Sequence, residues 1–434
     1  MKDILLFTPL DDFAKAQHEF VPLGLLYLCS YLEQFGFEVD VLHGKIDEIK
    51  DGYRFYGISS VTGQYSMALE ALRRIREIQP DAKVILGGAH LNAYEYRKES
   101  LGHGWDFLVA GDGEIPLRNI LFGEEDRQVI YGDPINDLDS LPLPAYHKID
   151  LSKYNFPLRD GIRCINLITS RGCPFKCNFC ATAGRTFRKR SVENVIKEVD
   201  LLVNKYGFNG LMFVDDTMSV DRQRYHDILT DLEAFNIKWR CYARTTTITL
   251  EGLDKMARSG CIECAPGIES GNQSILNLIE KGTSVDHNMD WCIYCEEIDI
   301  VCNPSLIIGL PSESPETVAL TYDFMRKLKP RAFSYNIFLP LYDSQIYLQR
   351  KTNKYRDRIT IYPYTWDDCR SKTKKVTQCF VSTPTLSRER ILEEYYRNYD
   401  AFAEITGFDP RQRGTRKDDL AQESLCNLEV SARM

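Results

Sequence analysis

Short apolar runs alternate along the chain with longer stretches in which apolar residues recur every three or four positions. The short runs predict buried strands, and the longer stretches predict helices with one apolar face. In the N-terminal part the expected strands are 4–8, 38–42, 56–60, 83–86 and 106–110. The expected helices are 23–35 and 66–78, and a further helix follows Glu114. Strands that alternate with helices of this length predict a doubly wound parallel sheet.

The same alternation resumes at residue 165 and continues to about residue 340. The expected strands are 165–170, 210–215, 239–244, 264–269, 303–309 and 332–338. The expected helices are 191–206, 221–235, 250–259, 272–281 with 286–298, and 315–328. Ser191 and Ser314 are expected to cap the first and last of them. This repetition predicts a partial (β/α)6 barrel, whose site would lie at the carboxyl ends of its strands.

A proline-containing stretch separates the two patterns. Residues 138–145 carry Pro142 and Pro144, which disfavour a helix there. We divide the chain into an N-terminal domain (1–130), a linker (131–160), the barrel (161–340) and a C-terminal capping region (341–434). The capping region holds several tyrosines and a charged helix from about residue 387 to 402. We expect it to close the barrel mouth and to exclude water.

Charge and cysteine content narrow the class of protein. The 434 residues include 54 basic and 62 acidic side chains, for a net charge of −8. This balance argues against general binding of the protein to nucleic acids or to anionic membranes. The longest apolar run, 21–32, is too short to span a membrane. With 14 cysteines and a strand directly after Met1, we expect a reducing cytoplasm and metal ligation rather than disulfides.

Three cysteines close together carry the strongest chemical signal. Cys173, Cys177 and Cys180 follow a predicted strand and the turn residue Gly172. Three thiolates on one loop can hold three irons of a [4Fe–4S] cube, which leaves the fourth iron open. The alternatives are a zinc loop or three buried cysteines. A structural zinc site needs four ligands, and no fourth Cys or His lies nearby in the sequence.

This C-x3-C-x2-C pattern, with the aromatic Phe179 before its last cysteine, resembles that of the radical S-adenosylmethionine (SAM) enzymes. The resemblance implies that the amino and carboxylate groups of SAM chelate the open iron. It further implies that the reduced cluster cleaves SAM to methionine and a 5′-deoxyadenosyl radical. An electron donor such as flavodoxin or ferredoxin would be the partner that reduces the cluster.

Polar residues and a glycine stand at the carboxyl ends of successive predicted barrel strands: Asp215, Asp216, Arg244, Glu269, Ser270 and Gly309. Buried adjacent carboxylates need a cation or a donor as partner. Because side chains alternate along a strand, we expect only one of the two aspartates to point inward, and the pattern does not decide which. Taken alone, each of these residues also suits a capping carboxylate or a surface ion pair.

The family resemblance gives these residues roles. The aspartate pair would bind the amino group of SAM, and Arg244 would pair with its carboxylate. Glu269 and Ser270 would contact the ribose hydroxyls, and Gly309 would lie on the adenine side.

Small residues also stand at the carboxyl ends of the N-terminal strands: Ser59, Ser60, Thr62, Gly87, Gly88 and Gly111. Doubly wound sheets bind ligands at these ends, and small residues let a bulky ligand approach the backbone. The arrangement resembles the cobalamin-binding domain that precedes many radical SAM domains. The loop 9–18 departs from it, because it lacks the D-x-H-x-x-G motif whose histidine ligates cobalt. This leaves open whether the domain binds cobalamin without a histidine ligand or binds none.

Several other features have simpler interpretations. We interpret His43 and His90 as ordinary loop histidines, and the basic residues of 185–190 as a solvated surface. Two further cysteine pairs have zinc-like spacing, but they fall within a predicted strand and a predicted helix. Buried free cysteine behaves there as a small apolar residue. The pairs are Cys261 with Cys264 and Cys292 with Cys295.

The sequence therefore predicts a cobalamin-dependent radical SAM methyltransferase that acts on an unactivated carbon of a small biosynthetic substrate. A radical SAM cyclase, mutase or epimerase without methyl transfer is the alternative. A binding or sensing protein without turnover is a third possibility. No motif in the sequence identifies the substrate.

Overall fold

The computed structural model describes residues 1–10, 18–158, 162–366, 368 and 378–409. These residues form two compact units. The first comprises Met1–Asn155 and the described part of Thr365–Lys372. The second comprises Phe156–Tyr364 and the described residues that follow 373. The two units are described separately below.

The first unit is built on a parallel sheet. Its strands are β1 (Lys2–Pro9), β2 (Val39–Gly44), β3 (Tyr53–Ser59), β4 (Lys83–Gly87), β5 (Phe107–Gly111) and β6 (Val129–Gly132). Their order in the sheet is β2-β1-β3-β4-β5-β6, and every pair is parallel. The strand β6 was not expected from the sequence.

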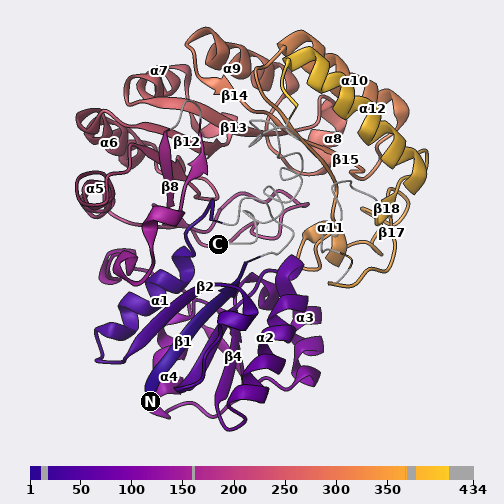
Figure 1. The fold of residues 1–434 in the computed structure, drawn as a ribbon. Helices are drawn as coiled ribbons and strands as arrows, with labels where there is room; N and C mark the ends of the chain where they lie inside the picture. The colour runs from indigo at the N-terminus through magenta and orange to yellow at the C-terminus, as the bar shows by residue number, and fades with distance from the viewer. Residues whose placement is uncertain (11–17, 159–161, 367, 369–377, 410–434) are drawn as a thin grey trace. The chain divides into compact units, whose positions relative to one another are not determined.

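Helices cover both faces of this sheet. They are α1 (Leu23–Glu33), α2 (Tyr65–Ile78), α3 (Tyr94–Ser100) and α4 (Glu114–Phe122). Alternate residues of β1 face opposite ways, so Leu5 and Phe7 share a core with α2, whereas Ile4 and Leu6 share one with α1 and α4. In Figure 1, α2 and α3 lie on one side of the sheet and α1 and α4 on the other. This confirms the predicted doubly wound sheet.

The second unit is a curled parallel sheet. Its parallel strands are β8 (Arg163–Leu167), β11 (Gly210–Phe213), β12 (Lys238–Ala243), β13 (Cys261–Glu269), β15 (Ser305–Ile308) and β16 (Ser334–Ile337). They follow one another in the sheet, and the short strand β7 (Phe156–Pro157) pairs antiparallel with β8 at one edge. A second short strand, β14 (Val301–Cys302), pairs with β13. In Figure 1 the strands form an arc with helices on its outer side, which confirms the predicted partial barrel.

The outer helices begin where the sequence places caps. They are α5 (Val192–Asp200), α6 (Arg222–Leu232), α7 (Leu250–Arg258), α8 (Gln273–Leu278), α9 (Val285–Glu297) and α10 (Pro315–Leu328). Ser191 accepts a hydrogen bond from the backbone N–H of Asn194. Ser314 accepts one from Thr317 and precedes Pro315 in the first turn of α10. Both predicted caps are confirmed.

The C-terminal region adds a helix to the barrel unit. After α11 (Gln345–Leu348), the strands β17 (Thr360–Ile361) and β18 (Val381–Ser382) pair antiparallel, and α12 (Arg388–Thr406) follows. Tyr395 of α12 stacks on Tyr335 of β16, with their ring centroids 5.4 Å apart. Trp366 belongs instead to the first unit, where its indole N–H donates to Glu99 over 2.6 Å. Residues 410–434 of the predicted capping region lie outside the described residues.

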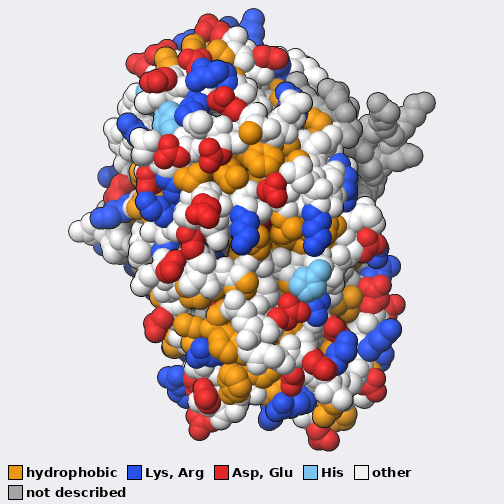
Figure 2. Space-filling model, turned by 90° about the vertical axis from the view of Figure 1, so that its left-hand side faces the viewer, with side chains coloured by type: hydrophobic (Ala, Val, Ile, Leu, Met, Phe, Trp, Pro, Cys, Tyr) orange, Lys and Arg blue, Asp and Glu red, His pale blue; other side chains and the backbone are white. Residues whose placement is uncertain are grey.

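Charged side chains of both signs are mixed over the face shown in Figure 2, without an extended patch of one sign. Arg190 corrects the interpretation of 185–190 as a uniformly solvated surface. Its side chain is 3% exposed and forms an ion pair with Glu198, because α5 covers it. Across the part of the chain that the structure describes, no helix is both long and apolar enough to cross a membrane.

Candidate functional site

The three cysteines of the motif lie on a closed loop beside the barrel strands. The loop leaves β9 (Ser170–Arg171) and returns through β10 (Arg188–Lys189), which pairs antiparallel with β9. Gly172 adopts a φ of +85°, and a Cβ there would lie 2.3 Å from the carbonyl oxygen of Thr186. A side chain at this position would therefore prevent the loop from closing.

Each thiol of the loop lies against a different polar group. Cys173 Sγ is 3.6 Å from Thr217 Oγ1, Cys177 Sγ accepts a hydrogen bond of 3.3 Å from Arg244 Nη1, and Cys180 Sγ is 3.2 Å from Thr182 Oγ1. Burial raises the pKa of the Cys180 thiol to about 11 and also raises that of Cys173. Buried thiols of this kind lose their protons when they coordinate a metal.

The donor set fits an iron–sulfur cluster better than a single metal ion. Within the described residues, no three Cys, His, Asp or Glu side chains are placed around one metal ion. In a [4Fe–4S] cube each cysteine ligates a different iron, so the thiolates do not converge on one point. The other cysteine pairs are core residues: Cys264 and Cys295 are fully buried, with their sulfurs 3.8 Å apart.

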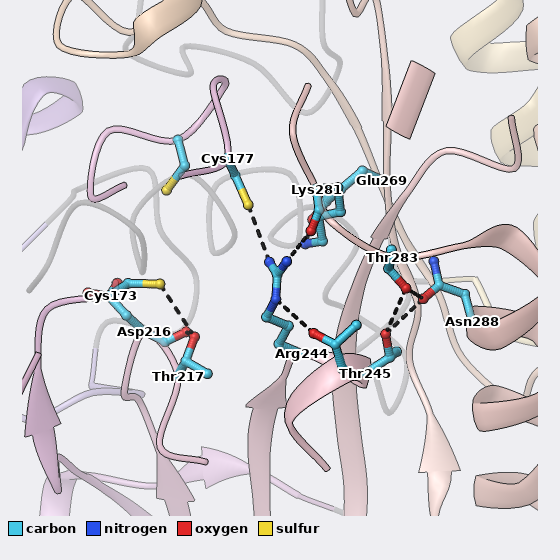
Figure 3. A network of polar contacts seen from close by, with 12 residues as sticks. Cys173, Cys177, Asp216, Thr217, Arg244, Thr245, Glu269, Lys281, Thr283 and Asn288 are labelled. Carbon is cyan, nitrogen blue, oxygen red and sulfur yellow. Dashed lines mark hydrogen bonds and ion pairs between the residues drawn. The ribbon is translucent and has the colours of Figure 1, made fainter. Parts of the chain in front are cut away.

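The two adjacent aspartates have different surroundings. Asp215 is 2% exposed and accepts hydrogen bonds from the backbone N–H and the hydroxyl of Thr169 and from the hydroxyl of Ser170. Asp216 lies beside the cysteine loop, next to Cys173 and Thr217 (Figure 3). The hydroxyl of Thr182 donates to its carboxylate over 3.3 Å. Burial raises the pKa of Asp216 to about 6. Of the two, Asp216 is therefore the carboxylate that faces the cysteines.

Arg244 lies between the cysteine loop and the segment that follows α8. Its Nη1 donates to Cys177, its Nη2 donates to the carbonyl of Lys281, and its Nε donates to Thr246 Oγ1 over 3.0 Å (Figure 3). The ring of Phe175 stacks on the guanidinium, with the centroid 3.9 Å away. The predicted contact of Arg244 with the carboxylate of SAM stays a prediction.

Lys281 is a site residue that the sequence did not reveal. Its ammonium forms a buried ion pair of 2.6 Å with Glu269 and lies 5.8 Å from the ring centroid of Phe179. Glu269 itself has a φ of +64°, an uncommon conformation for a residue other than glycine. A buried lysine needs such a partner, but the pairing spans 12 positions with no spacing pattern to signal it. Phe179, Glu269 and Lys281 therefore lie together near Cys177.

The side chain of Asn288 connects the segments that carry Arg244 and Lys281. Asn288 of α9 accepts hydrogen bonds of 2.8 Å from the hydroxyls of both Thr245 and Thr283 (Figure 3). Thr245 follows Arg244 in the chain, and Thr283 lies two residues after Lys281. Asn288 thereby links the two segments that carry the cations.

Ser270 and Gly309, which were predicted to contact SAM, form hydrogen bonds with other residues of the chain. Ser270 is fully buried, and its hydroxyl accepts a hydrogen bond from Asn272. Gly309 has a φ of +92°, and its N–H donates to the carboxyl of Glu313 over 2.6 Å. Their predicted contacts with the nucleoside of SAM stay predictions, and Glu313 is a further residue that shapes this turn.

The cysteine loop is also anchored by the C-terminal region. The side-chain amide of Asn178 donates to the hydroxyl of Tyr355 over 2.8 Å, and the N–H of Ile346 donates to the carbonyl of Asn178. Tyr355 is fully buried. The sequence did not signal this contact, because 177 positions separate the two residues.

In the first unit, the strand ends β3 and β4 lie side by side. The N–H of Ser60 donates to the carbonyl of Gly87, and a Cβ on Gly88 would lie 2.6 Å from the carbonyl oxygen of Ser60. A Cβ on Gly111 would likewise lie 2.5 Å from the carbonyl oxygen of Gly132. Backbone packing thus requires Gly88 and Gly111, whereas a Cβ on Gly87 would meet no atom closer than 3.9 Å.

His90 corrects the interpretation of this residue as an ordinary loop histidine. It is fully buried between Tyr65 and Tyr96, with ring centroids 3.9 Å and 4.6 Å away. Its Nδ1 is 3.4 Å from Thr62 Oγ1, and within the described residues its Nε2 has no hydrogen-bond partner. An unpartnered polar atom and the hydroxyls of Ser59 and Thr62 at this sheet edge fit a ligand with polar groups.

The comparisons with known proteins agree with this geometry. Residues 10–121 match the B12 binding domain, and residues 167–325 match the radical SAM superfamily. The chain is 27% identical to an uncharacterised methyltransferase of Pyrococcus horikoshii, over 87% of this chain and 88% of that protein. It is 25% identical to the anaerobic magnesium-protoporphyrin IX monomethyl ester cyclase of Cereibacter sphaeroides, over 88% of this chain and 66% of that protein.

A solved structure shares the fold over most of the chain. The radical SAM methyltransferase TsrM from Kitasatospora setae, with cobalamin and a [4Fe–4S] cluster bound, matches with a TM-score of 0.68 and 16% identity. The match covers 95% of this chain and 92% of TsrM. The chain therefore contains a radical SAM domain and a B12-binding domain.

Proposed function

We propose that this protein is a cobalamin-dependent radical SAM methyltransferase that acts on a carbon atom of a small biosynthetic substrate. The observation that carries the proposal is the presence, in one chain, of a three-thiol loop beside the barrel strands and a B12-binding domain. The similarity to the methyltransferase of Pyrococcus horikoshii supports it.

In this proposal Cys173, Cys177 and Cys180 ligate the cluster. When bound, the cluster supplies the electron that cleaves SAM, and the corrin supplies a methyl group. The chain provides binding, orientation and exclusion of water. The contact between Asn178 and Tyr355 contributes to that exclusion, because it fixes the C-terminal region against the cysteine loop.

Asp216 is the residue that we propose for the amino group of SAM. Its neighbour Asp215 already accepts three hydrogen bonds, which Thr169 and Ser170 donate. Among the described residues, the hydroxyl of Thr182 donates to Asp216, which lies beside the loop and can also accept a bond from an ammonium group. Lys281 and Arg244 are buried cations close to the loop, where they can attract the carboxylate of SAM.

A radical SAM cyclase is the second candidate function. The similarity to the magnesium-protoporphyrin cyclase covers as much of this chain as the similarity to the methyltransferase does. Both reactions would use the same cluster and SAM site. They differ in whether a methyl group of SAM appears in the product.

The proposal includes a protein that donates electrons, such as flavodoxin or ferredoxin. Cleavage of SAM by a reduced cluster consumes an electron, and neither SAM nor cobalamin supplies one in net terms. A chemical reductant can replace the partner in the assay described next.

The test uses SAM labelled in its methyl group and the protein purified without oxygen, with hydroxocobalamin supplied. We expect 5′-deoxyadenosine and S-adenosylhomocysteine together, with the label transferred to a substrate from a cell extract. Cys177→Ala should release no 5′-deoxyadenosine, because one iron would lose its ligand. Release of 5′-deoxyadenosine without S-adenosylhomocysteine or label transfer would favour the cyclase. Release by the Cys177→Ala variant would contradict the cluster assignment.

A further inference from the structure

Arg244 is held in one position by four contacts. Its three nitrogen atoms donate to Cys177, Lys281 and Thr246, and its guanidinium stacks on Phe175. The residue is 8% exposed. A guanidinium fixed in this way keeps its N–H directed at the sulfur of Cys177 without help from a ligand.

The positive charge of Arg244 has no acidic partner among the described side chains. The nearby carboxylate of Glu269 is already paired with Lys281. Asp216 lies on the side of Cys173 and Cys180, so on the Cys177 side the charge of Arg244 has no carboxylate of its own. A buried charge without a counter-ion is costly, so the site favours a negatively charged group at Cys177.

The other two cysteines lack a comparable side-chain donor. The hydroxyl of Thr217 donates to the carbonyl of Asp216 over 2.5 Å, and the hydroxyl of Thr182 donates to the Asp216 carboxylate. A hydroxyl has a single proton, so the hydroxyls of Thr217 and Thr182 have no second proton to donate to a thiolate. The backbone N–H groups of Phe175 and Thr182 also donate to Cys173 and Cys180. Arg244 is the cation that donates to a sulfur of the loop, at Cys177.

We propose that Arg244 raises the reduction potential of the cluster through its hydrogen bond and charge at Cys177. The inference rests on the proposed ligation of the cluster by Cys177. Reduction adds one negative charge to the cluster. Hydrogen bonds to the sulfurs and the net charge nearby set the potentials of such clusters. A fixed cation stabilises the reduced form more than the oxidised form, so the cluster accepts its electron more readily. This role is separate from any contact of Arg244 with SAM.

The experiment compares wild-type protein with Arg244→Met and Arg244→Lys, each prepared without oxygen and without SAM. Iron analysis establishes that each variant holds its cluster, and the EPR signal of the reduced cluster is followed in a redox titration. At the wild-type midpoint potential, we expect the ratio of reduced to oxidised cluster to fall about tenfold in Arg244→Met, which corresponds to about 59 mV for one electron. The ratio should fall less in Arg244→Lys, because lysine keeps the positive charge but lacks the planar guanidinium group.

Arg326→Met is the matched control, because it removes the same charge from an exposed position on α10. Its ratio should stay within about twofold of wild type, since solvent and salt screen a distant charge. Wild-type ratios in an Arg244→Met variant that holds its cluster would overturn the inference, even if the KM for SAM rose. If neither Arg244 variant held iron, Arg244 would be required for assembly, and the inference would also fall. If the wild-type signal survived in Cys177→Ala, the failure would lie in the proposed ligation itself.

Discussion

Asp215 and Asp216 are neighbours in the chain, yet they serve different purposes. Asp215 joins the end of β11 to Thr169 and Ser170, which lead into the cysteine loop. Asp216 points toward that loop. Both residues follow β11, which ends at Phe213, and the two carboxylates have different hydrogen-bond donors. The first therefore contributes to stability, and the second is available to a ligand.

We expect Asp216→Asn and Asp215→Asn to affect different measurements. Asp216→Asn removes the charge that would pair with the amino group of SAM, so the Kd for SAM should rise about tenfold, with unchanged thermal stability. Asp215→Asn replaces a carboxylate that accepts three hydrogen bonds, so it should lower the free energy of unfolding by about 2 kcal/mol. Calorimetric binding and thermal unfolding measure the two effects. A negligible loss of SAM affinity in Asp216→Asn would remove Asp216 from the site.

The turn between β15 and α10 depends on a carboxyl group that its surroundings keep protonated. Glu313 is 1% exposed, and its side chain accepts the N–H groups of Gly309 and Leu310. Burial raises its pKa from an ordinary value of 4.5 to about 8, although the two N–H groups act in the opposite direction. The hydroxyls of Thr383 and Thr385 donate to its backbone carbonyl, which ties the turn to the segment before α12.

This pKa predicts a pH dependence of stability. Between pH 4.5 and 8 the folded chain holds a proton on Glu313 that the unfolded chain releases, so ionisation favours unfolding as the pH rises. The group should lower the free energy of unfolding by up to ~1.4 kcal/mol per pH unit in this range. Glu313→Gln keeps the hydrogen-bond acceptor but cannot ionise. Its unfolding midpoint should therefore decline less than that of wild type between pH 5 and 8, and parallel profiles would contradict the assignment.

The elements were largely predictable because their signals are local. Apolar periodicity separated strands from helices, and Ser191 and Ser314 marked helix starts through bonds within one turn. The strand β6 and the helix α3 were missed, because both are short and lack a clear periodic pattern.

The site residues also divide into those with a local sequence signal and those without one. The cysteine spacing is local and was recognised. Lys281, Tyr355 and Asn288 act through partners that are distant in sequence or on another element. Arg190 was misjudged for the same reason, since its burial depends on α5 packing over it. Sequence patterns report local spacing, whereas tertiary packing decides which polar groups meet.

For the whole molecule, the two units match different cofactor-binding domains: the barrel unit matches the radical SAM superfamily, and the first unit matches the B12 binding domain. The barrel unit holds three thiols, two buried cations and Asp216 around one loop. In the first unit, Thr62 and His90 follow β3 and β4, and among the residues that the structure describes His90 Nε2 has no hydrogen-bond partner. The presence of both units is the feature on which the methyltransferase proposal rests. The similarity to the magnesium-protoporphyrin cyclase also covers 88% of this chain, so the fate of the methyl group of SAM is what separates the two candidate functions.

The most direct test of this account is the joint determination of iron and cobalt in protein produced and purified without oxygen, with hydroxocobalamin supplied. We expect about four irons and about one cobalt per chain, for one cube and one corrin. Iron without cobalt in repeated preparations would show that the first unit does not retain cobalamin, and it would contradict the methyltransferase proposal.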